Sequence, residues 1–298
     1  MQQPEAATGG TGTPGSLLAT LGLVDTGTVG RSPEVAGAVL SLILGLLLLT
    51  ATILGPLVRD LVRFHMSSDA LVQYVGGEIV TLLVAVVLVV SVPFWWLGQQ
   101  WPPTVAAGAA AYVVYTYATV VAGQEYDRYP GNVEKAFLLY VAITAAAVAL
   151  LVTSFRGLLA AGNLDGPRHL TGWVLIAIGG TVALLWLGQL AGFYRAGPTE
   201  EYRTATALFW LIKYLDLGLV IPLAVITGLL QRTPSAGTDA AAITMLGLLS
   251  WLLAALLFMA VEMVRRDTPG ASWALLIGTL VLLAPTSFVW VRWLTQGA

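Results

Sequence analysis

The chain has 298 residues, of which 57% are hydrophobic and 10% are charged, and its mean hydropathy is +0.83. Soluble domains carry about a quarter charged residues, so this composition excludes an ordinary soluble protein and indicates an integral membrane protein. The net charge of −2 and the lack of a basic run argue against a nucleic-acid partner. Because the sequence contains no cysteine, disulfides, thiolate metal ligands and cysteine nucleophiles are excluded.

The first 33 residues differ in composition from the rest of the chain. Residues 1–33 are rich in Gly, Thr and Pro and contain one short apolar patch, SLLATLGLV. No basic segment precedes that patch, so the pattern does not predict a cleaved signal peptide. We expect a flexible or surface-lying tail over 1–33. A single transmembrane bundle should fill 34–298, because no later loop is long enough to form a separate domain.

The remaining sequence alternates between long apolar stretches and short polar separators. A spanning helix needs about 20 mostly apolar residues. Eight stretches meet this requirement, at 35–58, 70–97, 104–122, 134–155, 170–193, 205–230, 240–264 and 272–294. The sequence therefore predicts an all-α fold, a polytopic transmembrane bundle of about eight spanning helices, with both termini on the same side of the membrane.

The distribution of basic residues predicts an orientation. Loops that follow odd-numbered helices carry eight Lys and Arg residues, whereas the other loops and the tails carry five. Cytoplasmic loops are enriched in Lys and Arg, so we expect both termini outside the cytoplasm. Within the bundle, the run TVAAGAAAY at 104–112 consists almost entirely of small residues. It predicts a close helix–helix contact.

Several of these stretches resemble a family of uncharacterised bacterial multi-pass membrane proteins. The resemblance rests on GGEIVTLLVAVVLVVSVP, AAYVVYTYATVVAG and EKAFLLYVAI, and on DLGLVIPLAVITGLL further along the chain. It covers loose, apolar motifs, and the family has no assigned activity to carry over. It implies an integral protein of the cell membrane of a prokaryote.

Three charged residues lie deep within predicted spans. Glu78 belongs to the second span, and Lys213 and Asp216 belong to the sixth. Each costs about 2.5–3.5 kcal/mol at a helix centre, so each needs a partner or a function. Glu78 and Lys213 both lie about 13 Å from the same face of the membrane, at 1.5 Å per residue. This matched depth predicts that they are in contact or bridged by one water if their helices touch.

The sixth span also contains a helix-breaking residue beyond its charges. Asp216 follows Lys213 by one helical turn. Pro222 cannot donate to the carbonyl of Gly218, so the helix should bend or loosen here. Charges beside a loosened backbone predict a polar cavity with Gly218 and Pro222 in its lining.

Tyrosines of the third span are further candidates for the lining of this cavity. Tyr112 and Tyr115 share one helix face, and Tyr117 points away from it. They could line a site for a quinone, a carotenoid or an aromatic solute. Alternatively, they pack in the core with their hydroxyls bonded to neighbouring helices.

These observations favour a proton- or cation-coupled small-solute transporter with Glu78, Lys213 and Asp216 as its coupling site. Two carboxylates beside one ammonium leave an excess negative charge, which a proton or a cation would balance. The alternative is a non-enzymatic membrane scaffold or accessory subunit, whose buried charges only pair helices. A third hypothesis is an intramembrane enzyme that acts on a lipid-soluble substrate. Besides the lipid bilayer, a small solute or cation, a second copy and another membrane subunit stay open as partners.

Other polar residues predict no cofactor, no metal site and no catalytic group. His65 and His169 fall in loops on opposite sides of the membrane, so they cannot share a metal or a haem. Walker, HExxH, GxSxG and Rossmann motifs are absent from the sequence. The polar loop 124–132 lacks a regular cation-binding pattern and should be solvated and internally paired. Glu262 should pair with Arg265 and Arg266, one turn further along its helix.

Overall fold

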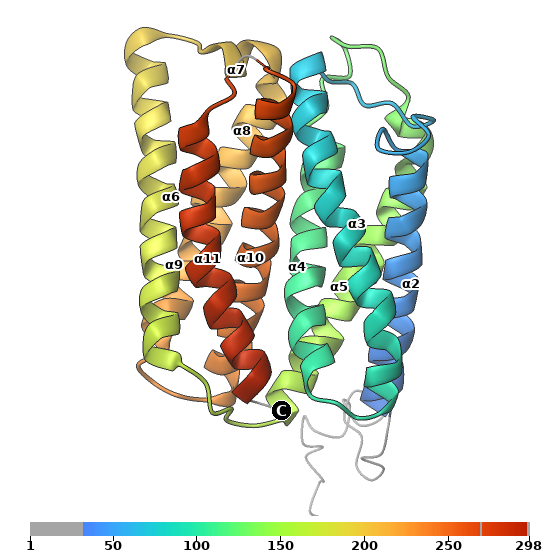
Figure 1. Ribbon diagram of the computed structural model, residues 1–298, viewed down its shortest axis with the longest axis vertical. Helices are drawn as coiled ribbons and strands as arrows, with labels where there is room; N and C mark the ends of the chain where they lie inside the picture. Colours follow the sequence, from blue (N-terminus) through green and yellow to red (C-terminus); the bar gives the residue numbers. More distant parts are fainter. Residues whose placement is uncertain (1–31, 269, 297–298) are drawn as a thin grey trace, which may run out of the picture. The chain divides into compact units, whose positions relative to one another are not determined.

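The computed structural model describes residues 32–268 and 270–296 (Figure 1). Of the predicted tail, only Ser32 and Pro33 belong to this part of the chain, and both lie in the first turn of a helix. The helices are α2 (Ser32–Leu54), α3 (Ser68–Trp96), α4 (Trp101–Ala122), η1 (Val133–Ala136), α5 (Phe137–Ala160), α6 (Arg168–Ala196), α7 (Glu200–Thr204), α8 (Thr206–Leu215), η2 (Asp216–Val220), α9 (Ile221–Leu230), α10 (Ala236–Arg265) and α11 (Trp273–Gln296).

Eight helical segments of the described residues are long and apolar enough to cross a membrane. η1 and α5 together form one of these segments, and α8, η2 and α9 form another. A helix satisfies its backbone hydrogen bonds internally, which is what a lipid environment demands of a spanning segment. The protein is a multi-pass integral membrane protein, and the predicted all-α bundle of about eight spans is confirmed.

Polar residues at the predicted separators set several helix ends. Ser67 precedes α3 and accepts a hydrogen bond from the backbone N–H of Ala70. Ser235 caps α10 in the same way, and Thr238 bonds back to the N–H of Ser235, which completes a capping box. Caps satisfy backbone N–H groups that would otherwise have no partner at a helix start.

Helix α10 forms the centre of the helix packing. It contacts α3, α4, α5, α6, α9 and α11, and Figure 1 shows it running beside α4 and α11. α4 and α10 approach so closely that a Cβ on Gly108 would lie 2.5 Å from the Cα of Gly247. Ala106, Ala107 and Ala110 on the same stretch are fully buried. The close contact predicted for 104–112 is therefore confirmed, with α10 as its partner.

A second pair of glycines joins two helices elsewhere in the bundle. A Cβ on Gly172 of α6 would lie 2.8 Å from the carbonyl oxygen of Gly228 on α9. Small residues allow membrane helices to gain packing contacts between backbones that larger side chains would keep apart. This contact holds α9 against α6 near the end of the sixth span.

Candidate functional site

The sixth span is interrupted by a π-helical turn near its middle. η2 (Asp216–Val220) separates α8 from α9, and the N–H of Ile221 donates to the carbonyl of Asp216, five residues back. Pro222 explains this widening, because it has no N–H to donate to Gly218 and its ring crowds that carbonyl. The loosened backbone predicted here is confirmed. Single π turns inside membrane helices often mark functional sites.

The carboxylate of Asp216 ties this π turn to two other helices. Oδ1 accepts a 2.7 Å hydrogen bond from the hydroxyl of Tyr115 on α4. Oδ2 accepts a 2.8 Å hydrogen bond from the indole N–H of Trp186 on α6. Ten residues separate Asp216 from the start of α8, which corresponds to about 15 Å of depth. A carboxylate with one donor per oxygen is thus held near the middle of the span.

Lys213 lies one turn before Asp216 in an environment made mainly of aromatic rings. Its side chain is 3% exposed, and its Nζ lies 3.4 Å from the ring centroid of Phe209 and 4.4 Å from that of Trp186. Its ion-pair partner is Glu201 of α7, at 3.7 Å, which is too long for a hydrogen bond. Nζ makes no hydrogen bond to the described residues. Trp186 therefore presents its ring face to the ammonium and its N–H to the Asp216 carboxylate.

A series of three charges leads from the surface into the bundle, in the order Glu201, Lys213 and Asp216. The Glu201 side chain is 55% exposed, whereas the side chain of Lys213 is buried. Glu201 lies between the spans predicted at 170–193 and 205–230, and the sequence alone did not connect it to the site. Closeness in the sequence could have indicated the connection, because α7, which carries Glu201, ends two residues before the start of α8, which carries Lys213.

Glu78 does not join this series. It is 5% exposed on α3, and Tyr74 and Thr52 lie beside its carboxyl group. Among the described residues it has no ion pair, and its Oε2 has no hydrogen-bond partner. The direct contact predicted between Glu78 and Lys213 is wrong, because equal depth does not place two side chains on facing helix surfaces. α4 contacts both α3, which carries Glu78, and α8, which carries Lys213.

The tyrosines of α4 are divided between these two regions. The Tyr112 hydroxyl lies 3.2 Å from the hydroxyl of Thr81 on α3, whereas Tyr115 bonds to Asp216. The two tyrosines therefore do not converge on one cavity, although they lie three residues apart. The ring of Tyr117 packs against Tyr140, with 5.5 Å between centroids. Gly218 lines a groove with Lys213, but Tyr112, Tyr115 and Pro222 are not among the lining residues, and the others are mostly apolar. The polar cavity predicted from the sequence therefore stays a prediction.

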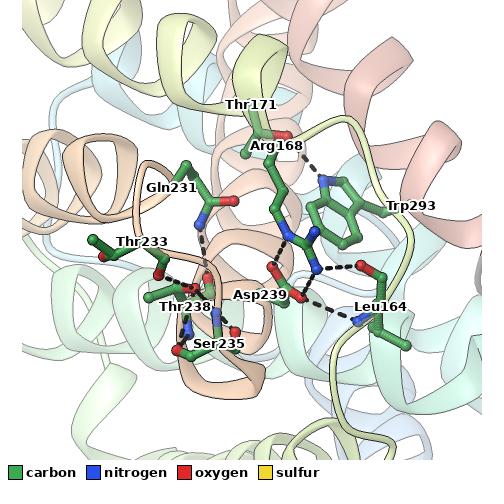
Figure 2. A network of polar contacts seen from close by, with 9 residues as sticks. All are labelled: Leu164, Arg168, Thr171, Gln231, Thr233, Ser235, Thr238, Asp239 and Trp293. Carbon is green, nitrogen blue, oxygen red and sulfur yellow. Dashed lines mark hydrogen bonds and ion pairs between the residues drawn. The ribbon is translucent and has the colours of Figure 1, made fainter.

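A buried ion pair that the sequence analysis missed lies at the opposite end of the bundle (Figure 2). Arg168 begins α6 and donates from Nε and Nη2 to the two carboxylate oxygens of Asp239, at 2.9 and 2.8 Å. Asp239 is 1% exposed and also accepts from the backbone N–H of Leu164. Nη2 of Arg168 donates in addition to the Leu164 carbonyl. This bidentate pair clasps the loop before α6 to the first turn of α10.

Further polar contacts surround this clasp. Trp293 of α11 donates its indole N–H to the hydroxyl of Thr171 at 2.9 Å, and Gln231 donates to the carbonyl of Thr238 (Figure 2). Arg168 lies just before the span predicted at 170–193, and Asp239 just before the span predicted at 240–264, so neither was considered as a partner inside the bundle. A signal existed, because both precede spans that begin on the same side of the membrane.

Two loops on the other side are joined through His65. Its Nδ1 lies 2.7 Å from the Tyr129 carbonyl oxygen, and its Nε2 lies 3.0 Å from a carboxylate oxygen of Glu134. The hydrogen bond to Glu134 raises the pKa of His65 above its ordinary value, against the opposing effect of burial. The backbone N–H of His65 also donates to the side-chain carbonyl oxygen of Gln124. The loop 124–132, which was predicted to be internally paired, is instead bonded largely to other segments, chiefly residues 61–65.

Other polar expectations can be compared directly with the structure. The residues at the end of α10 pair as predicted, since Glu262 accepts from Arg265 at 3.0 Å and from Arg266 at 3.2 Å. Glu125 of the polar loop accepts from the N–H of Ala207 at 2.6 Å, at the start of α8. No cluster of His, Asp and Glu within the described residues is arranged to hold a metal ion.

Comparisons of the chain with protein-family models, curated proteins and solved structures found no match.

Proposed function

We propose that the protein is a proton- or cation-coupled transporter of a small solute, with Asp216 as its coupling group. The observation that carries the proposal is the position of this carboxylate on a π turn near the middle of a spanning segment. Ionisable side chains are costly at this depth and frequently belong to proton or ion pathways. The π turn adds a backbone that can change its hydrogen-bond register.

The charges around Asp216 support coupling to a positive ion. Glu201 and Asp216 flank the single ammonium of Lys213, so the series holds one excess negative charge when all three groups are ionised. A proton or a cation would balance this charge. Glu201 reaches the surface, so the series supplies a route along which charge could enter. Glu78 is not part of this proposal's coupling site, because it lies with Tyr74 and Thr52.

The scaffold hypothesis has one observation in its favour. Both carboxylate oxygens of Asp216 are bonded, and the bonds join α4, α6 and η2. Such a satisfied group can fix the register of helices without any transport. In this alternative the protein is a scaffold or an accessory subunit, and the charges serve only helix pairing.

We place the protein in the cell membrane of a prokaryote, with both termini outside the cytoplasm. The excess of Lys and Arg in loops that follow odd-numbered spans supports this orientation. The resemblance of several stretches to an uncharacterised bacterial family supports the choice of membrane.

Ion flux into proteoliposomes tests the proposal. Purified protein is reconstituted with a dye inside the vesicles that responds to the ion under test, and proton, sodium and potassium gradients are imposed in turn. We expect the wild-type protein to carry one of these ions and Asp216→Asn to reduce the flux to the rate of empty vesicles. Asn retains the shape of the side chain but cannot exchange a proton or carry a charge. Thermal unfolding of the same samples separates loss of function from loss of fold.

Ser250→Ala is the control at matched insertion. Ser250 is buried on α10, and its hydroxyl has no hydrogen-bond partner among the described residues. Wild-type flux is expected from this variant. A wild-type protein that moves no ion under any gradient, together with an Asp216→Asn effect on stability alone, would reject transport in favour of the scaffold.

A further inference from the structure

A groove beside Lys213 opens on the side of the bundle. It has a volume of about 360 Å³ and is lined by Leu190, Trp210, Lys213, Tyr214, Leu217 and Gly218. Tyr214 is 76% exposed and Trp210 is 38% exposed, so the outer wall of the groove is on the bundle surface. These residues lie within spanning segments, so the groove faces the hydrocarbon region of the bilayer.

Lys213 is the cation of this otherwise apolar groove, and its charge is incompletely satisfied. An ammonium has three N–H donors. Here it makes no hydrogen bond to any residue in 32–268 or 270–296, and its ion pair with Glu201 is 3.7 Å long. The faces of Phe209 and Trp186 stabilise the charge without accepting a conventional hydrogen bond. A buried cation with free donors favours an anion that can bind it at hydrogen-bond distance.

We infer that this groove binds a single-chain amphiphile with a carboxylate head, which enters sideways from the bilayer. The carboxylate bonds to the ammonium of Lys213, and the chain lies against Leu190 and Leu217. A volume of about 360 Å³ is at the small end of ligand pockets, which span about 300–1,000 Å³, and suits one chain rather than a two-chain lipid. The inference rests on the proposed function, since it names the class of the transported solute.

Glu201 has a defined part in this inference. It is the present counter-ion of Lys213, and the incoming carboxylate takes its place. Once the ammonium is bound to the ligand, Asp216 and Glu201 are both short of a positive partner. The carboxylate of the ligand raises the excess negative charge of the site from one to two, and uptake of a proton or a cation lowers it again, which couples ligand binding to ion binding. Removing the charge of Glu201 should therefore tighten anion binding, whereas removing that of Lys213 should weaken it.

Photolabelling of the purified full chain in neutral detergent tests the inference. The probe is a dodecanoate that carries a diazirine on its chain, and the matched probe is its methyl ester. We expect saturable labelling by the acid, at residues of the groove, and none by the ester. Lys213→Met should weaken labelling by about tenfold or more, which corresponds to about 1.4 kcal/mol. Lys213→Arg should retain it, and Glu201→Gln should strengthen it by about twofold to tenfold.

Two further variants make the test independent of the stability of Lys213→Met. Lys135→Met removes the other lysine of the chain, which is exposed on η1, and should leave labelling unchanged. Gly218→Leu should block labelling while leaving Lys213 in place, because an added Cβ at Gly218 meets open space in the groove. Equal labelling by acid and ester would overturn the inference. So would unchanged labelling in Gly218→Leu together with weaker labelling in Glu201→Gln.

The two proposals can fail separately. Ion flux that depends on Asp216 without saturable labelling would reject the amphiphile and keep the transporter. Saturable labelling that depends on Lys213 in a protein without flux would keep the binding site and reject transport.

Discussion

The hydroxyl of Tyr115 donates a 2.7 Å hydrogen bond to the carboxylate of Asp216. This bond joins the third span to the π turn of the sixth span, across 101 residues of sequence. Asp216 depends on neighbouring helices for both of its donors, since the other comes from Trp186 on α6. Movement of α4 relative to η2 would therefore change the charge environment of Asp216 directly.

Tyr115→Phe removes this donor and keeps the ring. We expect the free energy of unfolding in detergent to fall by about 1.5–3 kcal/mol, the usual worth of a hydrogen bond to a charged group. Ion flux should also fall when wild type and variant are compared at equal amounts of protein inserted in the vesicles. Tyr126→Phe is the control, because the Tyr126 hydroxyl bonds to the Val121 carbonyl on an exposed surface. Equal effects of the two variants on the free energy of unfolding would show that the Tyr115 hydrogen bond stabilises the protein no more than the exposed Tyr126 bond does.

Glu78 and Lys213 should behave as independent sites. They share no partner in the part of the chain that the structure describes, since Glu78 lies with Tyr74 and Thr52 whereas Lys213 pairs with Glu201. We expect the effects of Glu78→Gln and Lys213→Met on unfolding free energy to add to within about 0.5 kcal/mol in the double variant. A double-mutant cycle measured by thermal or denaturant unfolding checks this. A coupling energy above about 1 kcal/mol would indicate that a water or a change of conformation connects them.

The sequence was sufficient to predict the fold because membrane helices follow simple rules of length and polarity. All eight spans were predictable from apolar length, and Pro222 was sufficient to predict the loosened backbone that the structure shows as η2. The close contact of α4 with α10 followed from the small residues at 104–112. Each of these predictions depends on local sequence alone.

The candidate site was only partly predictable, because its contacts depend on which helices are neighbours. Depth along a helix can be counted from the sequence, but the direction of a side chain around the bundle cannot. Glu78 and Lys213 were therefore assigned to each other, although α4 contacts both of their helices. The same limit hid the Arg168–Asp239 pair, whose members are 71 residues apart.

Asp239→Asn should cause a large loss of stability. It leaves Arg168 as a charge without its bidentate partner in a mostly buried site, and breaking such a pair costs about 3–5 kcal/mol. The matched control is Asp60→Asn, because Asp60 pairs with Arg63 at 3.9 Å on an exposed surface. That change should cost no more than about 1 kcal/mol. If the unfolding curves of the two variants superimpose, the Arg168–Asp239 ion pair does not contribute more to stability than the exposed pair does.

Both ends of the chain should lie on the same side of the membrane, outside the cytoplasm. An even number of spans requires the first condition, and the distribution of Lys and Arg favours the second. Reporters fused at the two ends should both be active outside the cytoplasm, and a reporter in the loop 123–132 should be active inside. Opposite locations of the two ends would mean that one of the eight segments does not cross.

His65 should make stability depend on pH. Both ring nitrogens face acceptors, the Tyr129 carbonyl and the Glu134 carboxylate, and only the protonated imidazole can donate to both. The pKa of His65 is accordingly raised in the folded protein, chiefly by the bond to Glu134. A raised pKa means that protonation favours the folded state. The contribution is therefore complete below the unfolded value of about 6.5 and is lost as the pH rises through the higher folded value.

His65→Gln removes this titration, so the difference in melting temperature between wild type and variant should depend on pH. We expect wild type to be favoured most at about pH 6, where Glu134 can still accept, and the advantage to shrink by about pH 8.5. His169→Gln is the control, because His169 is exposed at the start of α6, on the other side of the bundle. Its melting temperature should follow that of wild type across the range. A constant difference between wild type and His65→Gln from pH 6 to pH 8.5 would mean that the imidazole holds the two loops together in its neutral form, with Glu134 contributing no charge-dependent bond.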